Sequence, residues 1–154
     1  MTISAILLTE YEEEMAATRL ILERVPEDKF AWVPHPKSYT LGALVNHIAS
    51  IPLMPAVLLR GEPATRSEAA SKAEILQTLE ANVAVGRQAI ASASDFQLTQ
   101  TVQVSPSVYK PKWSVLRRML MNHLIHHRGQ LTVYLRLLEV PVPGMYGPSA
   151  DEKA

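Results

Sequence analysis

Cysteine is absent from the sequence, and charge is sparse and evenly balanced. The 154 residues contain 15 Lys and Arg against 15 Asp and Glu, so the net charge is zero with neutral histidines. Without cysteine, a disulfide framework, a thiolate metal site and a cysteine nucleophile are all excluded. Balanced charge argues against nucleic acid as the main partner, because phosphate binding requires a surplus of Lys and Arg. Any bound metal must therefore be held by nitrogen and oxygen ligands.

A targeting leader and a membrane-spanning helix are not expected either. The apolar start from Met1 to Leu8 is short, has no basic residues and is followed by acidic residues at positions 10 and 12–14. No stretch approaches the roughly 18 apolar residues that suggest a membrane span. We therefore expect a cytoplasmic protein without a membrane partner.

Apolar residues are abundant, and they recur at helical spacing. They make up 47% of the chain against 19% charged residues, which excludes a disordered protein, and the length predicts a single domain over 1–154. Helical periodicity predicts an all-α fold with four core helices. Their expected ranges are about Ile3–Arg24, Thr40 to the region of Pro52 and Pro55, Glu68–Ala91, and Ser114–Leu138.

The remaining segments are predicted to be connections. Ser38 or Thr40 should cap the second helix, and the polar stretch 61–67 is expected to be a loop. The connection 92–111 is too long for a tight turn, and its residues 101–104 are expected to be extended. The tail 139–154 is rich in proline and glycine, so irregular structure is predicted there.

Histidine placement is the most informative feature. His123 and His127 are four residues apart on the fourth predicted helix, so both project from one face, and we expect that face to point into the interior. His47 lies within the apolar stripe of the second helix. One inward histidine is usually a core residue, but three buried imidazoles from two helices need partners. A divalent metal would satisfy all three, with a fourth position open to water or substrate, so we predict this site over a metal-free histidine network.

Two further residues are weaker candidates for a catalytic role. His126 lies about 60° around the helix from His123 and fits either an acid–base group in the cavity or, as we prefer, an interface contact. Glu14 lies at the edge of the first helix's apolar stripe. It could approach the metal as an acid–base group, but a side chain reaching solvent is the simpler expectation. Arg128 points away from His127 and favours a structural salt bridge or a tail contact.

Three segments together resemble a known family. They are residues 32–38 (WVPHPKS) with 41–48 (LGALVNHI), residues 123–131 (HLIHHRGQL), and the tail from Tyr134 through 146–152 (YGPSADE). They resemble, in order across essentially the whole chain, the DinB family of metal-binding four-helix proteins, the DinB/YfiT-like superfamily. One departure is Glu139, where the family typically has Gly to end the fourth helix in a left-handed conformation.

The resemblance implies a fold, a metal and a range of activities. It implies an up-down-down-up four-helix bundle of the DinB/YfiT-like type with an irregular C-terminal tail. It also implies a divalent metal, zinc or nickel, on His47, His123 and His127, and a homodimer. Some relatives are transferases or isomerases that use a low-molecular-weight thiol such as bacillithiol, mycothiol or glutathione.

Three functions follow from these expectations. The leading hypothesis is a metal-dependent enzyme acting on a small molecule, most plausibly a thiol-dependent transferase of stress or detoxification type. Because the chain has no cysteine, the thiol would have to come from a cosubstrate. A metal-dependent hydrolase is the nearest chemical alternative. The third hypothesis is a non-catalytic, dimeric metal-binding stress protein, which a site closed by a fourth protein ligand such as Glu14 would favour.

Overall fold

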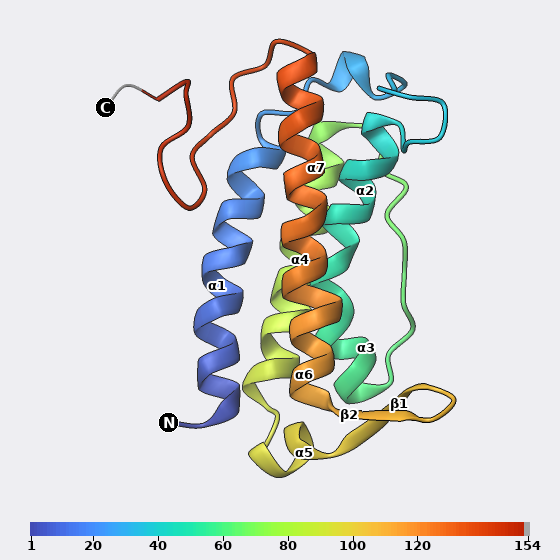
Figure 1. The fold of residues 1–154 in the computed structure, drawn as a ribbon, viewed down its shortest axis with the longest axis vertical. Helices are drawn as coiled ribbons and strands as arrows, with labels where there is room; N and C mark the ends of the chain where they lie inside the picture. The colour runs from blue at the N-terminus through green and yellow to red at the C-terminus, as the bar shows by residue number, and fades with distance from the viewer. Residues whose placement is uncertain (153–154) are drawn as a thin grey trace.

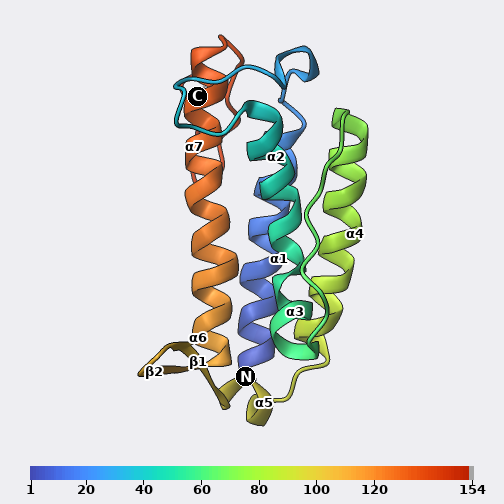
Figure 2. The same cartoon turned by 90° about the vertical axis from the view of Figure 1, so that its right-hand side faces the viewer.

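Four long helical stretches run side by side in the computed structural model, which describes residues 1–152. They run up, down, down and up along one axis, and the linker before α4 returns along the outside of the bundle (Figures 1 and 2). The long helices are α1 (Ile3–Leu22), α2 (Leu41–Ser50), α4 (Lys72–Ala91) and α7 (His123–Leu137). The predicted all-α four-helix bundle is confirmed.

The second stretch is broken where its prolines require it. Thr40, not Ser38, is the N-cap of α2, and its side chain accepts a hydrogen bond from the backbone N–H of Ala43. A 3-10 turn over Ile51–Leu53 then leads into α3 (Met54–Arg60). Because proline has no N–H to donate, the regular helix ends before Pro52, and α-helical structure resumes at Met54.

This broken stretch corrects one expectation. Residues Leu41–Arg60 are long and apolar enough to cross a membrane by length and composition, although no such run was predicted. More than half of its most apolar window lies buried inside the bundle, where Leu44 and Ile48 are fully inaccessible. The apolarity is thus accounted for by packing against the other helices.

A glycine brings α4 close to this break. A side chain at Gly86 would meet the Pro52 carbonyl oxygen and the Tyr11 hydroxyl. That hydroxyl donates to the carbonyl oxygens of Pro52 and Val83 at 3.2 Å each, and burial raises the pKa of Tyr11 above its ordinary value. The absence of a Cβ therefore lets three elements share one buried polar contact.

Helix α4 begins four residues later than predicted. Its N-terminus is a capping box in which the Ser71 hydroxyl accepts from the Glu74 N–H while the Glu74 carboxylate accepts from the Ser71 N–H. The helical periodicity continues upstream to Glu68, but the reciprocal cap at Ser71 sets the boundary. Residues 61–71 therefore form one long polar linker.

The connection after α4 contains more structure than expected. A short helix, α5 (Asp95–Thr99), precedes an antiparallel hairpin of β1 (Thr101–Ser105) and β2 (Val108–Pro111). The extended piece predicted at residues 101–104 is confirmed, whereas its partner strand and α5 were not predicted.

The fourth stretch consists of three consecutive helical segments, two α-helical and one π-helical. Helix α6 (Lys112–Leu116) continues into a π-helical segment over Arg117–Asn122, and α7 follows directly. The π turn shifts the buried face, so that Leu116 and Met121, five residues apart, are both buried. It ends immediately before the histidine motif.

The end of α7 explains the departure at Glu139. This residue has φ 56°, a left-handed conformation, and its N–H donates to the Arg136 carbonyl while the Val140 N–H donates to Leu135. This pair of bonds is a Schellman motif, in which glycine is the favoured residue at the left-handed position. The helix thus ends as a glycine would end it, but with a residue that has a Cβ.

Replacing Glu139 with Gly is expected to stabilise the protein. A left-handed conformation costs an L-residue with a Cβ about 1 kcal/mol, partly offset by the greater flexibility of unfolded glycine. Thermal unfolding of Glu139→Gly should give a higher Tm, whereas Glu139→Ala should leave the Tm close to that of the wild type. A lower Tm for the glycine variant would contradict the inference that Glu139 is strained.

Candidate metal site

Three imidazoles converge between α2 and α7. The Nε2 atom of His47 lies 3.2 Å from Nε2 of His123 and 3.1 Å from Nε2 of His127. One ligand nitrogen from each residue lies within 4.8 Å of the others, and no other His, Cys, Asp or Glu of residues 1–152 joins this group. His127 is buried, whereas His47 and His123 are half-buried. The sequence reasoning correctly brings these three residues together.

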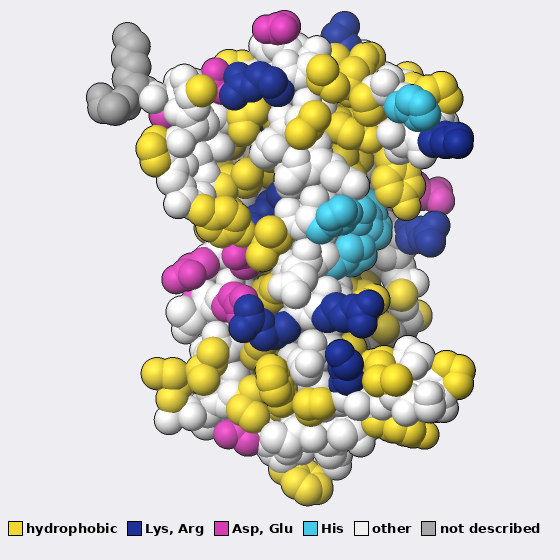
Figure 3. All heavy atoms as spheres, in the orientation of Figure 1, with side chains coloured by type: hydrophobic (Ala, Val, Ile, Leu, Met, Phe, Trp, Pro, Cys, Tyr) yellow, Lys and Arg dark blue, Asp and Glu magenta, His cyan; other side chains and the backbone are white. Residues whose placement is uncertain are grey.

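Only His127 lies in the interior as expected, whereas the half-buried His47 and His123 reach the surface. Histidine side chains are visible on the surface in the middle of one face, with Lys and Arg side chains nearby (Figure 3). The apolar residues of α2 and α7 on either side of the cluster, such as Leu44 and Leu124, form the core instead. The histidines therefore border solvent, and a small molecule can reach them.

A hydrogen bond orients His127. Its Nδ1 lies 2.8 Å from Oε1 of Gln130, one helical turn along α7. A carbonyl oxygen only accepts, so with this assignment Nδ1 carries the hydrogen and the Nε2 lone pair faces the other histidines. A neighbour that holds the distant ring nitrogen is the usual support for a metal-ligating histidine.

The spacing of the nitrogens fits a divalent metal better than a hydrogen-bond network. Three nitrogens at roughly 2.0–2.1 Å from one ion, in tetrahedral directions, lie about 3.3 Å from one another. The two Nε2 separations from His47 are close to this value. A neutral imidazole has one N–H, so His47 cannot satisfy both neighbouring lone pairs by donation. The three residues present therefore suit a zinc- or nickel-type site.

Comparison with known proteins decides the family. A model of the DinB superfamily matches residues 10–131, which include all three histidines. This chain belongs to the DinB superfamily. Among curated proteins, the uncharacterized protein YrdA of Bacillus subtilis strain 168 is 48% identical over 44 residues, a match that spans 29% of this chain and about a quarter (26%) of that relative.

Two solved structures of DinB-like proteins share the fold. One, from Bacillus cereus ATCC 10987, has a TM-score of 0.74 at 24% identity, and the alignment covers 90% of this chain and 95% of that protein's chain. The other, YjoA from Bacillus subtilis, has a TM-score of 0.70 at 20% identity, and the alignment covers 91% of this chain and 98% of that protein's chain. At this identity the likeness establishes the DinB-like fold alone.

Burial lowers the pKa values of two histidines in this DinB-like site. The pKa of His47 falls from its ordinary 6.5 to about 4, mainly because burial disfavours the charged form, with further lowering by His127, His123 and Arg66. Burial also lowers the pKa of His127, opposed by its hydrogen bond to Gln130. Both imidazoles are therefore neutral at pH 7, as ligation requires.

The metal-free protein is expected to lose stability as the pH falls below about 6.5. The unfolded chain then binds protons that folded His47 and His127 resist, so unfolding is favoured progressively down to about pH 4. Urea unfolding in EDTA at about pH 7, 5.5 and 4.5 measures this loss. His47→Gln should show a smaller loss over the same range, and an equal loss in both proteins would contradict the assignment.

The two weaker catalytic candidates occupy different places. His126 is exposed and its ring centroid lies 5.0 Å from that of His127, so it borders the cluster without joining it. Glu14 is only 7% exposed, not a solvent-reaching residue as expected, and it does not belong to the histidine group. Its carboxylate instead forms an ion pair with Arg128.

Arg128 and Glu14 form a buried cluster with the C-terminal tail. The Arg128 guanidinium donates to the carbonyl and carboxylate of Glu14, to Thr18 and to the Tyr146 hydroxyl. That hydroxyl in turn donates to the Glu14 carboxylate, and burial together with this bond raises the pKa of Tyr146 to about 12. The salt bridge and tail contact predicted for Arg128 are both present, and they tie the tail to α1.

Two cavities border the histidines on either side of Arg66. A cavity of about 350 Å³ lined mainly by polar residues and an apolar one of about 200 Å³ share His47, Ser50 and Arg66 in their walls. The sequence reasoning did not single out Arg66 or its supporting residue Asn46. Nothing in a polar loop marks one arginine, although Asn46 lies beside His47 within the segment that resembles the family.

Proposed function

We propose that this DinB superfamily member binds one divalent metal ion, zinc or nickel, through His47, His123 and His127 and acts as a metal-dependent enzyme. The observation that carries the proposal is the convergence of three Nε2 atoms, two of them 3.1–3.2 Å from the third, on a face with adjoining cavities. Three neutral ligands and an open side are typical of catalytic rather than closed structural sites.

The reaction class that we propose is transfer to a low-molecular-weight thiol. A divalent cation held by three neutral imidazoles would lower the pKa of a thiol and so favour the nucleophilic thiolate at neutral pH. The chain holds His127 in one tautomer through Gln130, and burial lowers the pKa values of His47 and His127 and so favours their neutral forms. Because it contains no cysteine, the thiol is a cosubstrate. The exposed ring of His126 is a candidate to accept or return a proton at the solvent-facing side of the histidine cluster.

A metal-dependent hydrolase and a non-catalytic metal-binding stress protein are the alternatives. Hydrolysis would use the same open side with water in place of the thiol. A non-catalytic site would be favoured by a fourth protein ligand, but Glu14 pairs with Arg128 instead. The homodimer and a cytoplasmic location accompany the proposal as predictions from the family resemblance and the sequence.

Metal analysis and a thiol screen test the proposal in sequence. Protein purified without a histidine tag should contain one equivalent of zinc or nickel, and an absence of metal would refute it. The metal-loaded protein is then incubated with 1-chloro-2,4-dinitrobenzene and glutathione, cysteine, bacillithiol or mycothiol. We expect the wild-type protein to consume thiol faster than His123→Ala does. If the wild type contains stoichiometric metal but consumes thiol no faster than this variant, the two alternatives would be favoured instead.

A further inference from the structure

The linker 61–71 is held against α2 beside the histidines. The Asn46 side chain accepts from the Ala69 N–H at 2.8 Å and from the Ser67 hydroxyl, and donates to the Ala69 carbonyl at 3.0 Å. The Ser67 N–H donates to the Ser50 hydroxyl at 2.8 Å. Asn46 and Ser50 flank His47 on the same helix, so the linker is positioned by the helix that carries a proposed ligand.

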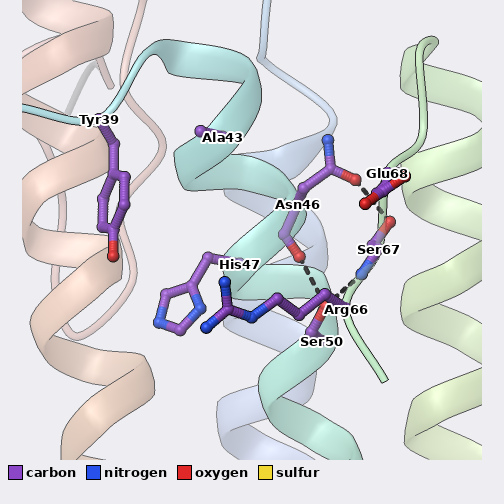
Figure 4. A pocket seen from close by; sticks show the side chains of 8 residues that line it. All are labelled: Tyr39, Ala43, Asn46, His47, Ser50, Arg66, Ser67 and Glu68. Carbon is purple, nitrogen blue, oxygen red and sulfur yellow. Dashed lines mark hydrogen bonds between the residues drawn. The ribbon is translucent and has the colours of Figure 1, made fainter. Parts of the chain in front are cut away.

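This attachment directs Arg66 toward His47. Figure 4 shows the Arg66 side chain extending across α2 with its guanidinium beside the His47 ring, while Glu68 lies away from it near Ser67. None of the ion pairs found within residues 1–152 includes Arg66. Arg66 is exposed and lines both cavities. An accessible guanidinium thus faces the site with no carboxylate of the described chain to neutralise it.

The cavity on the other side of Arg66 is apolar. Its walls include Leu53, Met54, Val57 and Met119, and it reaches His47 and His123. Its volume of about 200 Å³ suits a short aliphatic or aromatic group. A ligand in this cavity would therefore meet hydrocarbon over much of its walls, and a planar cation together with His47 and His123 in the remaining wall.

We propose that Arg66 binds the carboxylate of a small substrate whose apolar part lies between α3 and the π-helical segment. The assignment deepens the proposed function and rests on it. Three neutral imidazoles leave the charge of a bound metal uncompensated, so the metal and Arg66 together select an anion and disfavour a cation. A guanidinium donates two parallel hydrogen bonds to a carboxylate, which also orients the attached chain. Asn46 is a positioning residue for Arg66.

Calorimetric titration with hexanoate tests the contact directly. Zinc-loaded wild-type protein should bind hexanoate about tenfold or more tightly than Arg66→Gln does, as expected for a charge-assisted hydrogen bond. Hexanamide should bind both proteins with equal, weak affinity. From butanoate to hexanoate, affinity should rise about fourfold per methylene as the apolar cavity fills. A flat chain-length series would overturn the apolar half of the proposal.

Arg118→Gln is the matched control. Arg118 borders His123 from the opposite side, in a cavity that Arg66 does not line, and the substitution changes the net charge equally. It should leave hexanoate affinity within about twofold of the wild type. If both variants lost the same hexanoate affinity, the cause would be the change in net charge, and the specific contact with Arg66 would be overturned. Asn46→Ala should weaken hexanoate binding but not hexanamide binding, a selectivity that a general loss of structure would not produce.

Metal content separates this inference from the proposed function. Arg66→Gln should retain full zinc, and zinc missing from the wild type would refute the proposed function alone. In the metal-free proteins, zinc cannot coordinate the carboxylate directly. We expect the wild type still to bind hexanoate more tightly than Arg66→Gln under these conditions. Unchanged hexanoate affinity in zinc-loaded Arg66→Gln would overturn the role of Arg66 while the metal site stands.

Discussion

Replacing His123 with Ala is expected to lower zinc affinity by about 100-fold to several thousandfold. Zinc sites with a full ligand set bind with roughly 10–16 kcal/mol of free energy, and losing one ligand forfeits about a quarter to a third of it. His47 and His127 alone remain to hold the ion, and no other metal-binding side chain within residues 1–152 joins the group. Competition with a chromophoric chelator at pH 7 measures the affinity.

Gln130→Ala provides a graded comparison for this loss. It removes the hydrogen bond that orients His127 but leaves all three ligands, so zinc affinity should fall only about 10- to 100-fold. His126→Ala should leave the affinity nearly unchanged, because that residue lies outside the group. Unchanged zinc binding in His123→Ala, or a larger loss in His126→Ala, would refute the ligand assignment.

Replacing Arg128 with Met should destabilise the fold by about 3–5 kcal/mol. Arg128 is 1% exposed, and its removal leaves the Glu14 carboxylate buried with the Tyr146 hydroxyl as its remaining polar side-chain partner. Breaking a buried ion pair from one side incurs the desolvation of the remaining charge. Urea unfolding of the metal-free protein measures the loss, and zinc stoichiometry in the folded variant should remain that of the wild type.

The double variant Glu14→Leu with Arg128→Met tests the physical reason. With both charges removed, most of the lost stability should return, because apolar side chains of similar volume often match a buried ion pair. The Arg128 Nε has no hydrogen-bond partner among residues 1–152, which lowers the net value of the original pair. A double variant as unstable as Arg128→Met would indicate that packing, not the unpaired carboxylate, determines the effect.

Features that depend on neighbouring residues were predictable. The four-residue spacing of His123 and His127 fixes their common face whatever the rest of the chain does, since α-helix geometry repeats locally. The Thr40 cap and the break at Pro52 likewise follow from backbone hydrogen bonding. The π-helical segment over Arg117–Asn122 was not predictable in this way, because its sequence is equally compatible with an ordinary helix.

Contacts between distant residues were decided by tertiary structure. Glu14 reads as a helix-edge residue in sequence, yet it pairs with Arg128, 114 positions away, because two helices and the tail meet there. The linker that carries Arg66 has no periodicity, and its position depends on the Asn46 side chain. The sequence by itself thus determined the four long helical stretches, the grouping of the three histidines and the exclusion of cysteine chemistry. Only packing decided that the histidines border solvent beside an arginine with no ion-pair partner among residues 1–152, since burial and the surrounding charges depend on how the helices are placed against one another.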